Sequence, residues 1–505
     1  MSASIKRPPG LLRGRPQNGR LRRWAALPAI LAGALALRLI GGVAFANYDT
    51  LYALAWGGQL ARGETPAYGV PIAPTPHPLL ELLGLVLAPL GPSATAHVTA
   101  WLGLLALSAC AWVIYRLGAD WFGRPAGALA ALIFITRTPV LSYGVRAYVD
   151  LPYLLLVLCA LLVESRHRRR HARPAGAPVL VLLALAGLLR PEAWVFSGLY
   201  WLYLMGWVPR FARRGMEAWP TRTRAEIARL TLLAASAPLI WMLSDLAVTG
   251  NPLWSLSHTR NTASELDRTT GIANVPEYIP RRIGEILRPP VLLAAALGGV
   301  LSVLWLRPRA LPGAIAGVIA VIVFAAFASL GLPINTRYAF LAASILCIFA
   351  GAGVFGWTLL KRGDPRRRWW MAGGALLLLA LLAFVPSDYH SAHRELGKLA
   401  RQQSIEGDLL ALVASRAINL RCGPVGVPNH APVPLLALYL ETSPANIVSL
   451  QSGHIASGVY VDPASSEVEE DYVLDKHDPH ETVTVPPGFT AIASDRSWLI
   501  FQRCV

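Results

Sequence analysis

Apolar stretches recur along most of this chain and constrain its fold more than any other feature. Each approaches the roughly 20 residues that cross the hydrocarbon core of a bilayer as a helix. Charged residues make up only 15% of the chain, against roughly a quarter in soluble proteins. The pattern therefore predicts a polytopic α-helical membrane protein with about 11 transmembrane helices. The stretches are Trp24–Ala46, Thr95–Tyr115, Ala126–Tyr143, Leu151–Val163, Pro178–Leu189, Val195–Val208, Leu230–Val248, Val291–Leu306, Ile315–Leu332, Ala339–Leu360 and Trp370–Val385.

Two parts of this assignment have alternatives. The basic N-terminus, the first stretch and the sequence "AFA" that ends it also fit a cleavable signal peptide. That stretch is long for a signal peptide and contains Arg38, so a retained span is favoured. Pro178–Leu189 and Val195–Val208 are short and also fit a broken or re-entrant pair.

Arginine placement predicts the orientation. With residues 1–23 as a basic cytoplasmic tail, the inner loops are "RLGADWFGR", "ESRHRRRHAR", "PRFARRGMEAWPTRTRAEIAR", "RPRALPG" and "KRGDPRRRWW". All are arginine-rich, as expected for cytoplasmic loops of a membrane protein. The formal charge of +17 is thus explained without a nucleic-acid partner.

The outer side then carries the functional candidates. They include a first outer loop at residues 47–94, a long outer loop at 249–290, and the turns "YGVRAYVDLP" and "GLPINTRY". Residues 387–505 read as a small extracytoplasmic α/β or α+β domain, separate from the transmembrane domain at 24–386. In it, "SIEGDLLALVASRAINL" predicts a helix, "GPVGVPNHAPVPLLALYL" strand and turn, and "EVEEDYVLDKHD" a solvated acidic stretch. Cys422 and Cys504 are a candidate disulfide in an oxidising compartment, and no cysteine spacing indicates zinc.

Carboxylates and arginines at the outer ends of the spans suggest chemistry. Asp49 follows the first span and Asp150 opens the fourth, and either can deprotonate an acceptor hydroxyl. The alternatives are a solvated loop residue for Asp49 and a helix N-cap for Asp150. Guanidinium suits phosphate, although snorkelling to lipid headgroups remains an alternative. The candidates are Arg38 within an apolar stretch, Arg190 and Arg337 at the ends of others, and Arg146, Arg260, Arg268, Arg281, Arg282 and Arg288 outside; Glu192 fits a partner of Arg190 or a helix cap.

The ordered motifs resemble a known family. They are "LALRL", "YDTLYALAWGGQLARGETPAYG", "PHPLLELLGLVLAPLG", "DWFGRPAGALAALIF", "YGVRAYVDLPYLLL", "GLLRPEAW" and "NTRYAFLA". This set is similar to the membrane-embedded C-type (GT-C) glycosyltransferases. Within them it resembles the branch of protein O-mannosyltransferases and lipid A aminoarabinose transferases, over most of residues 24–360. Here Leu151 separates the Asp150 and Pro152 that form a pair in that family.

The resemblance implies a site and a reaction. Asp49 and Asp150 match the catalytic carboxylates, and His77, Arg337 and Tyr338 would lie at the donor phosphate. Arg146 and Arg260 join this set as outer-side arginines suited to phosphate. The implied reaction is inversion at a sugar carbon, from a polyprenyl-phosphate donor to an acceptor hydroxyl of a glycan, protein or lipid at the outer membrane face. No cofactor is implied, and "NYD" in place of two adjacent acids does not support a metal.

Two other functions remain open. A transporter or flippase for a lipid-linked substrate would also have many spans and arginines near the membrane. No repeat of hydropathy between halves, common in transporters, is visible in the sequence. A non-catalytic scaffold with a polymer-binding outer domain is the third possibility.

Overall fold

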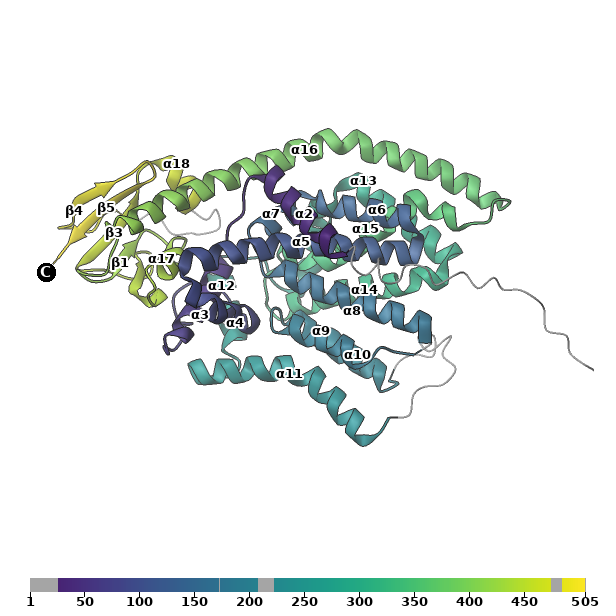
Figure 1. Ribbon diagram of the computed structural model, residues 1–505, viewed down its shortest axis with the longest axis horizontal. Helices are drawn as coiled ribbons and strands as arrows, with labels where there is room; N and C mark the ends of the chain where they lie inside the picture. The colour runs from purple at the N-terminus through teal and green to yellow at the C-terminus, as the bar shows by residue number, and fades with distance from the viewer. Residues whose placement is uncertain (1–25, 172, 208–221, 474–483, 505) are drawn as a thin grey trace, which may run out of the picture.

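The computed structural model describes residues 26–171, 173–207, 222–473 and 484–504. These form a helical bundle with a small sheet domain at one end (Figure 1). The predicted tail at 1–23 and most of the loop "PRFARRGMEAWPTRTRAEIAR" lie outside the described residues. The bundle consists of α2 (Ala26–Gly41), α5 (Pro92–Phe122), α6 (Arg124–Ile135), α7 (Thr138–Val145), α8 (Asp150–His171), α9 (Ala177–Gly187), α10 (Glu192–Leu204), α11 (Arg224–Thr249), α13 (Val275–Trp305), α14 (Arg307–Ser329), α15 (Phe340–Phe355) and α16 (Pro365–Ala414).

The prediction of a multi-pass helical membrane protein is confirmed. Every predicted apolar stretch contains a helix in the part of the chain that the structure describes. Within the described residues, six helices are long and apolar enough to cross a membrane, and α6 with α7 makes a seventh if that bent pair is one span. The remaining predicted spans correspond to shorter helices or, for α8, to one with a basic end. The count of about 11 spans therefore stays a prediction.

One predicted span is broken in two. The stretch Ala126–Tyr143 forms α6 and α7, which are bent by 66° relative to each other. The cause is Pro139, whose ring would clash with the carbonyl of Ile135 if the helix continued. The break leaves Arg137 buried between the two helices.

Both long outer loops are largely helical. The first contains α3 (Tyr48–Ala61) and α4 (Pro78–Leu87), and the second contains α12 (Trp254–Glu265) and the beginning of α13. Glycine allows α3 and α4 to pack closely, because a Cβ at Gly57 would lie 2.5 Å from the carbonyl oxygen of Glu81. Helices α3, α4 and α12 lie between the bundle and the sheet domain (Figure 1).

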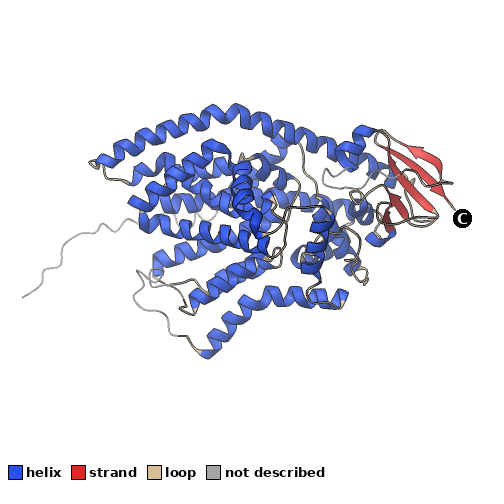
Figure 2. Cartoon of the chain, turned by 180° about the vertical axis from the view of Figure 1, so that it is seen from behind, coloured by secondary structure: helices blue, strands red, loops and turns tan. Residues whose placement is uncertain are grey.

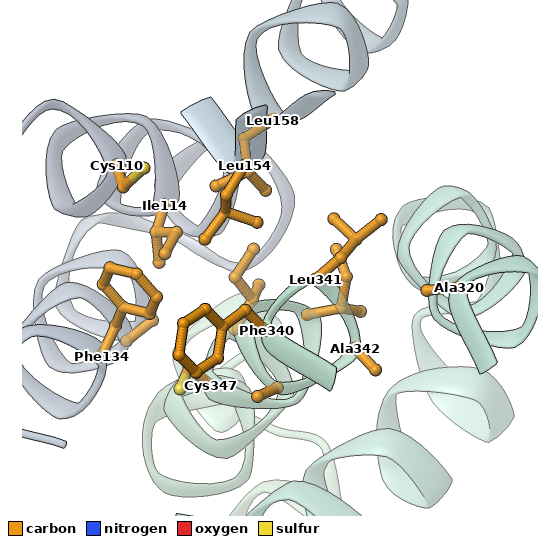
Figure 3. Close-up of a cluster of buried hydrophobic side chains, with 14 of the residues drawn as sticks. Cys110, Ile114, Phe134, Leu154, Leu158, Ala320, Phe340, Leu341, Ala342 and Cys347 are labelled. Carbon is orange, nitrogen blue, oxygen red and sulfur yellow. The ribbon is translucent and has the colours of Figure 1, made fainter. Parts of the chain in front are cut away.

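The centre of the bundle is built around α15. Most of its residues are buried, and its side chains meet those of α5, α6 and α8 (Figure 3). Phe340 and Cys347 lie in this cluster, with Ile114 and Leu154 on neighbouring helices. On another face, α15 touches α13 through small residues, since a Cβ at Gly298 would lie 2.0 Å from the carbonyl oxygen of Phe349. This core fixes the short 3-10 helix Thr336–Ala339 that leads into α15.

The C-terminal part is a small mixed sheet, as predicted (Figure 2). Its strands are β1 (Val425–Val427), β2 (Ile447–Ser449), β3 (Gly458–Pro463), β4 (Thr490–Ser494) and β5 (Trp498–Arg503), in the order β2-β1-β3-β5-β4. Strands β2, β1 and β3 are parallel, and β5 runs antiparallel to both β3 and β4. A disulfide joins Cys422 to Cys504, whose Cα atoms lie 4.9 Å apart.

Three details differ from the sequence interpretation. Helix α16 runs without interruption through Pro386, so the boundary expected there is not marked by the end of an element. The segment expected as strand and turn contains β1 but also the helix α17 (Val433–Tyr439), which packs on α3. The acidic stretch begins as helical turns at Ser466–Val468 and Glu469–Val473, and the rest of it lies outside the described residues.

Candidate active site

Asp49 lies on a helix, not in a solvated loop. It occupies the first turn of α3, where Asn47 caps the helix by accepting a hydrogen bond from Thr50 N at 2.8 Å. A carboxylate is favoured at such a helix N-terminus. Arg337 donates to Asp49 Oδ2 across 2.7 Å, and the Asp49 side chain is only 16% exposed. The alternative of a solvated loop residue is therefore wrong.

The start of α3 is bound to the turn that carries Asp150. Asn47 N donates to Arg146 O at 3.0 Å, and Thr50 Oγ1 donates to Ala147 O at 2.8 Å. Ala147 has φ of 49°, a conformation that costs free energy for a residue other than glycine and needs support from its surroundings. These bonds bring two carboxylates together from segments about a hundred positions apart.

Arginine side chains connect the two carboxylates. Asp150 is the first residue of α8 and is buried, and its Oδ1 accepts from Arg190 Nη1 at 2.5 Å. Arg337 Nη1 lies 4.0 Å from Asp150 Oδ2, an oxygen without a hydrogen-bond partner among the described residues. Arg190 also pairs with Glu192 at 3.0 Å, as the sequence suggested. Carboxylates and guanidinium groups thus alternate from Asp49 to Glu192.

Aromatic rings lie beside the same arginines. The Arg190 guanidinium carbon lies 4.4 Å from the centroid of the Tyr338 ring. Tyr148 has Arg337 at 5.9 Å and Arg146 at 4.9 Å from its ring centroid. Cation–π contacts of this kind hold guanidinium groups without neutralising them. Positive charge therefore remains available to an anionic ligand.

His77 approaches the cluster as a neutral side chain. It is the N-cap residue of α4 and is buried, and its Nδ1 has no hydrogen-bond partner among the described residues. Burial and then the positive charge of Arg190 lower the pKa of His77 to about 3, against a weaker opposing effect of Asp49. The imidazole is thus uncharged at neutral pH and can offer a hydrogen bond but no charge.

Asp49 is held ionised by its partner. Burial of the carboxyl favours the neutral form, but the nearby Arg337, with smaller effects from His77 and Arg268, lowers the pKa of Asp49 below its ordinary value. A carboxylate in this state is ready to accept a proton once the neighbouring positive charge is engaged elsewhere.

Most of the residues expected at the site come together. Asp49, Asp150, His77, Arg146, Arg337 and Tyr338 belong to one cluster. Arg260 interacts elsewhere: it lies on α12 and its Nε donates to Leu330 O at 2.7 Å. Arg38, marked as an arginine within the first span, lies in the last turn of α2.

Arg190 was not predicted to be at the donor site, although the sequence places it at the end of an apolar stretch. Such arginines are costly and are usually paired or functional. That signal was available, but it could not reveal that Asp150 is the partner. Tyr148, and Tyr153, whose ring centroid lies 6.0 Å from the Arg190 guanidinium carbon, were also missed, because tyrosines near membrane surfaces are common for other reasons.

A cavity opens beside the charged cluster. It holds only about 20 Å³ of free space, and its polar side is formed by Arg190, Glu192, Arg337 and Tyr338. Its other side is apolar, formed by Phe196 of α10, Leu341 of α15, and Ala320, Val323, Phe324 and Phe327 of α14. The pocket therefore places two guanidinium groups beside an apolar wall.

No group of three or more His, Cys, Asp or Glu side chains that could hold a metal ion occurs within residues 26–171, 173–207, 222–473 and 484–504. In the cluster, the carboxylates face arginines.

Solved structures with the same arrangement of elements exist, although no protein-family model and no curated protein matches the sequence. ArnT from Cupriavidus metallidurans in the apo state superposes with a TM-score of 0.54 at 14% identity, over 95% of this chain and 98% of ArnT. ArnT bound to undecaprenyl phosphate gives a TM-score of 0.51 at 14% identity, with the same coverage. The oligosaccharyltransferase of Archaeoglobus fulgidus in the apo form gives 0.49 at 12% identity, over 90% of this chain and 70% of that protein. The two ArnT structures therefore show that the chain has the fold of ArnT over 95% of its length.

Proposed function

We propose that this chain is an inverting membrane glycosyltransferase of the GT-C type. It moves a sugar from a polyprenyl-phosphate donor to an acceptor hydroxyl at the outer face of the cytoplasmic membrane. In this orientation the N-terminus is cytoplasmic and the sheet domain is extracytoplasmic, in agreement with the arginine-rich inner loops.

The observation that carries the proposal is the chain of ion pairs Asp49–Arg337–Asp150–Arg190 at the polar end of a mostly apolar cavity. Planar guanidinium groups bind phosphate oxygens bidentately, and the phenylalanines of the opposite wall suit isoprene units. The fold adds support, because ArnT has been solved with undecaprenyl phosphate bound.

The proposed reaction is a single displacement at the anomeric carbon. Donor phosphate engages Arg190 and Arg337, which draws Arg337 away from Asp49. Freed from its partner, Asp49 becomes more basic and accepts the proton of the acceptor hydroxyl. The acceptor oxygen forms its bond to the anomeric carbon as the bond from that carbon to the phosphate oxygen breaks, and polyprenyl phosphate leaves. Both arginines stabilise the negative charge that develops on the phosphate.

Asp150 and His77 have supporting roles in this scheme. Asp150 fixes Arg190 through the bond at 2.5 Å and keeps Arg337 within 4.0 Å. His77 offers a neutral hydrogen bond, which avoids a further positive charge that would hold the product phosphate too firmly. The acceptor can be a glycan, a protein or a lipid.

The test is transfer from radiolabelled polyprenyl-phosphate sugars by the purified full-length chain in lipid nanodiscs. We expect transfer from at least one sugar of the panel and its loss in Asp49→Asn. Glu277→Gln, an exposed carboxylate in the first turn of α13, is the matched control and should remain active. If the folded wild type transfers no sugar and instead moves the lipid-linked donor across the vesicle membrane, the flippase interpretation replaces this one.

A further inference from the structure

A second cavity lies where the first outer loop meets the sheet domain, outside the charged cluster. Residues 67–71 of the loop form one wall, and β2 with the turn after it, up to Gly453, forms much of the other. Its free volume is about 410 Å³, and it is partly open to solvent. We call this cavity the β2 groove. Its size is within the range of ligand-binding sites, which is roughly 300–1,000 Å³.

The lining of the β2 groove carries no charge. It consists of the aliphatic side chains of valine and isoleucine, Pro71, four glycine and alanine residues, and the hydroxyls of Ser449 and Ser452. A charged ligand would lose its hydration here without gaining an ion pair, which is costly. The groove therefore selects an uncharged ligand, in contrast to the arginine cluster.

An edge strand lines this groove. Strand β2 is the outermost strand of the sheet and pairs only with β1, in parallel, with Ile447 opposite Val425. Leu450 N donates to Val427 O at 2.9 Å, so the main-chain groups of Leu450 point toward β1. In a parallel pair successive residues direct their main-chain groups to opposite sides. The carbonyl of Ile447 and the N–H of Ser449 therefore point away from β1.

Ser449 gives a second, independent indication of a ligand. Its residue is only 8% exposed, it lines the groove, and its hydroxyl has no hydrogen-bond partner among the described residues. A buried hydroxyl without a partner costs free energy of about 1–3 kcal/mol. An occupant that supplies a hydrogen bond recovers this cost.

We propose that the β2 groove binds an extended, uncharged polypeptide segment with small side chains, and that this segment is the acceptor of the transferase. Main-chain groups of the segment pair with the free edge of β2, as in other complexes formed by strand addition. A glycan fits less well, because the lining provides only two side-chain hydroxyls for the many hydroxyls of a sugar chain. This inference rests on the proposed function, since it names the acceptor of the same reaction.

The groove is also linked to the carboxylate that would activate the acceptor. Tyr48 precedes Asp49, and its hydroxyl donates to Ile72 O at 3.0 Å, next to Pro71 in the groove wall. The wall of the groove is therefore joined to the residue that precedes Asp49, and we place the acceptor serine or threonine beyond the bound segment, toward Asp49.

Gly69 provides a variant that changes the groove without disturbing the fold. It is exposed, it lines the groove, and a Cβ added there meets no atom within 4 Å. Gly69→Glu thus places a negative charge in the groove. Gly407→Glu is the matched control, because Gly407 is exposed on α16, away from the groove lining, and its Cβ would also meet nothing within 4 Å.

The experiment uses the full-length chain in nanodiscs with two tritiated probes. One is the blocked peptide acetyl-Ala-Val-Ala-Val-Ala-Pro-Thr-Ala-amide, and the other is a neutral linear glucose hexasaccharide. We expect the peptide to bind wild type and Gly407→Glu equally, and Gly69→Glu at least about tenfold more weakly, which corresponds to about 1.4 kcal/mol. The hexasaccharide should not compete with the peptide. Competition by the hexasaccharide, or equal peptide binding by both variants, would overturn the proposal.

Transfer assays separate this proposal from the proposed function. With an active donor, Gly69→Glu should raise KM for the peptide acceptor at least about tenfold and leave donor affinity unchanged. If sugar is transferred only to a glycan or lipid acceptor, with the same KM in both glycine variants, the groove proposal fails while the transferase stands. If the peptide binds as described but no donor supports transfer, the function fails and the peptide is not an acceptor.

Discussion

Arg337 is shared between two carboxylates, and this sharing has a consequence for donor binding. In the described structure its Nη1 lies 2.7 Å from Asp49 and 4.0 Å from Asp150. A donor phosphate has to compete with Asp49 for that guanidinium. Asp49 is therefore expected to weaken donor binding while it promotes transfer, because one carboxylate cannot pair with Arg337 and activate the acceptor at once.

Asp49→Asn separates these two effects. Transfer should fall by about 10²–10⁴-fold, the usual contribution of a general base. Affinity for polyprenyl phosphate should rise severalfold, since Arg337 no longer has a full negative partner. Equilibrium binding of labelled polyprenyl phosphate to the purified variant measures the second effect. If the variant loses both transfer and lipid affinity, Asp49 contributes to donor binding and not to activation of the acceptor.

Arg337→Lys tests the geometry of the shared arginine. Lysine retains the charge but has a single ammonium group that cannot address a carboxylate and a phosphate together. We expect KM for the donor to rise about tenfold or more. Arg260→Gln is the comparison, because Arg260 binds Leu330 O outside the cluster, and its KM should stay within about twofold. Equal effects of both changes would place Arg260 back in the donor site.

At the level of single residues, the sequence predicted which side chains matter better than it predicted their partners. Asp49 and Asp150 stood out because acids are rare at the span ends. Their arginine partners could not be deduced, since Arg337 lies 288 positions from Asp49 and Arg190 lies 40 positions from Asp150. Arg260 bonds to Leu330 O outside the cluster, because membership of a loop does not determine which side of the bundle a helix covers, and its role at the donor site stays a prediction.

Among the elements, α4 depends on a capping interaction that also positions His77. Glu81 accepts from His77 N at 3.1 Å and from the Tyr68 hydroxyl at 2.5 Å. This bond gives a partner to the main-chain N–H of the N-cap residue, which has none within the helix. Because Glu81 is buried, the pKa of its carboxyl is raised to about 7, even though both hydrogen bonds act in the opposite direction.

This raised pKa predicts a pH dependence of stability. Between the ordinary glutamate pKa of about 4.5 and about 7, the folded protein binds a proton at Glu81 that the unfolded chain does not. The stabilisation from Glu81 is complete below that window and is lost as the pH rises through it, by on the order of 3 kcal/mol. In Glu81→Gln this contribution is absent. The Tm of wild type relative to Glu81→Gln should thus fall from pH 4.5 to 7.5. The Tm difference between wild type and Glu277→Gln, which retains Glu81, should stay constant over the same range.

Helix α16 is tied to the bundle by a buried ion triad. Asp388 pairs with Arg137 at 2.6 Å and with Arg288 at 3.0 Å, from three elements distant in the sequence. The Arg137 side chain is 7% exposed and that of Asp388 16%. Arg288 sits at a break in α13, with φ of 62° before two prolines. The triad therefore holds the broken ends of α6 and α13 against α16.

Asp388→Asn should destabilise the protein strongly. It leaves Arg137 buried without its charge partner, a change that typically costs about 3–5 kcal/mol. Glu64→Gln is the comparison, since the Arg62–Glu64 pair is exposed and such pairs contribute about 0–1 kcal/mol. Thermal unfolding in detergent should show a large drop in Tm for Asp388→Asn alone. Equal Tm values for the two variants would mean that the triad contributes no net stability.

Sequence patterns predicted some helices better than others. Apolar stretches predicted a helix at each span because burial in lipid requires main-chain hydrogen bonds within the segment. Pro139 is visible in the sequence, but the length of the apolar stretch around it led to the prediction of a single span. Helices α3 and α12 were interpreted as parts of loops, because glycine and proline follow α3 and polar residues dominate α12. They are stabilised instead by contacts with distant segments, such as Thr75 with Thr259 at 2.5 Å.

For the whole molecule, the open question is its orientation, and α16 provides the means to test it. This helix runs 50 residues from Pro365 to Ala414, which at 1.5 Å per residue is about 75 Å. The hydrocarbon core is only about 30 Å thick. Its two ends must therefore lie on opposite sides of the membrane if its apolar N-terminal half forms a span.

Gly363→Cys and Gly407→Cys report on the two sides. Both glycines are exposed, and an added Cβ meets nothing within 4 Å at either position. The native thiols interfere little, since Cys110 and Cys347 are buried, Cys159 is half-buried, and Cys422 and Cys504 are joined to each other. A membrane-impermeant maleimide on intact cells should label Gly407→Cys. Gly363→Cys should be labelled only after the cells are permeabilised, because arginine-rich loops such as the one before α16 stay in the cytoplasm. The reverse pattern would place Asp49 on the cytoplasmic side, where a donor at the outer leaflet cannot reach it.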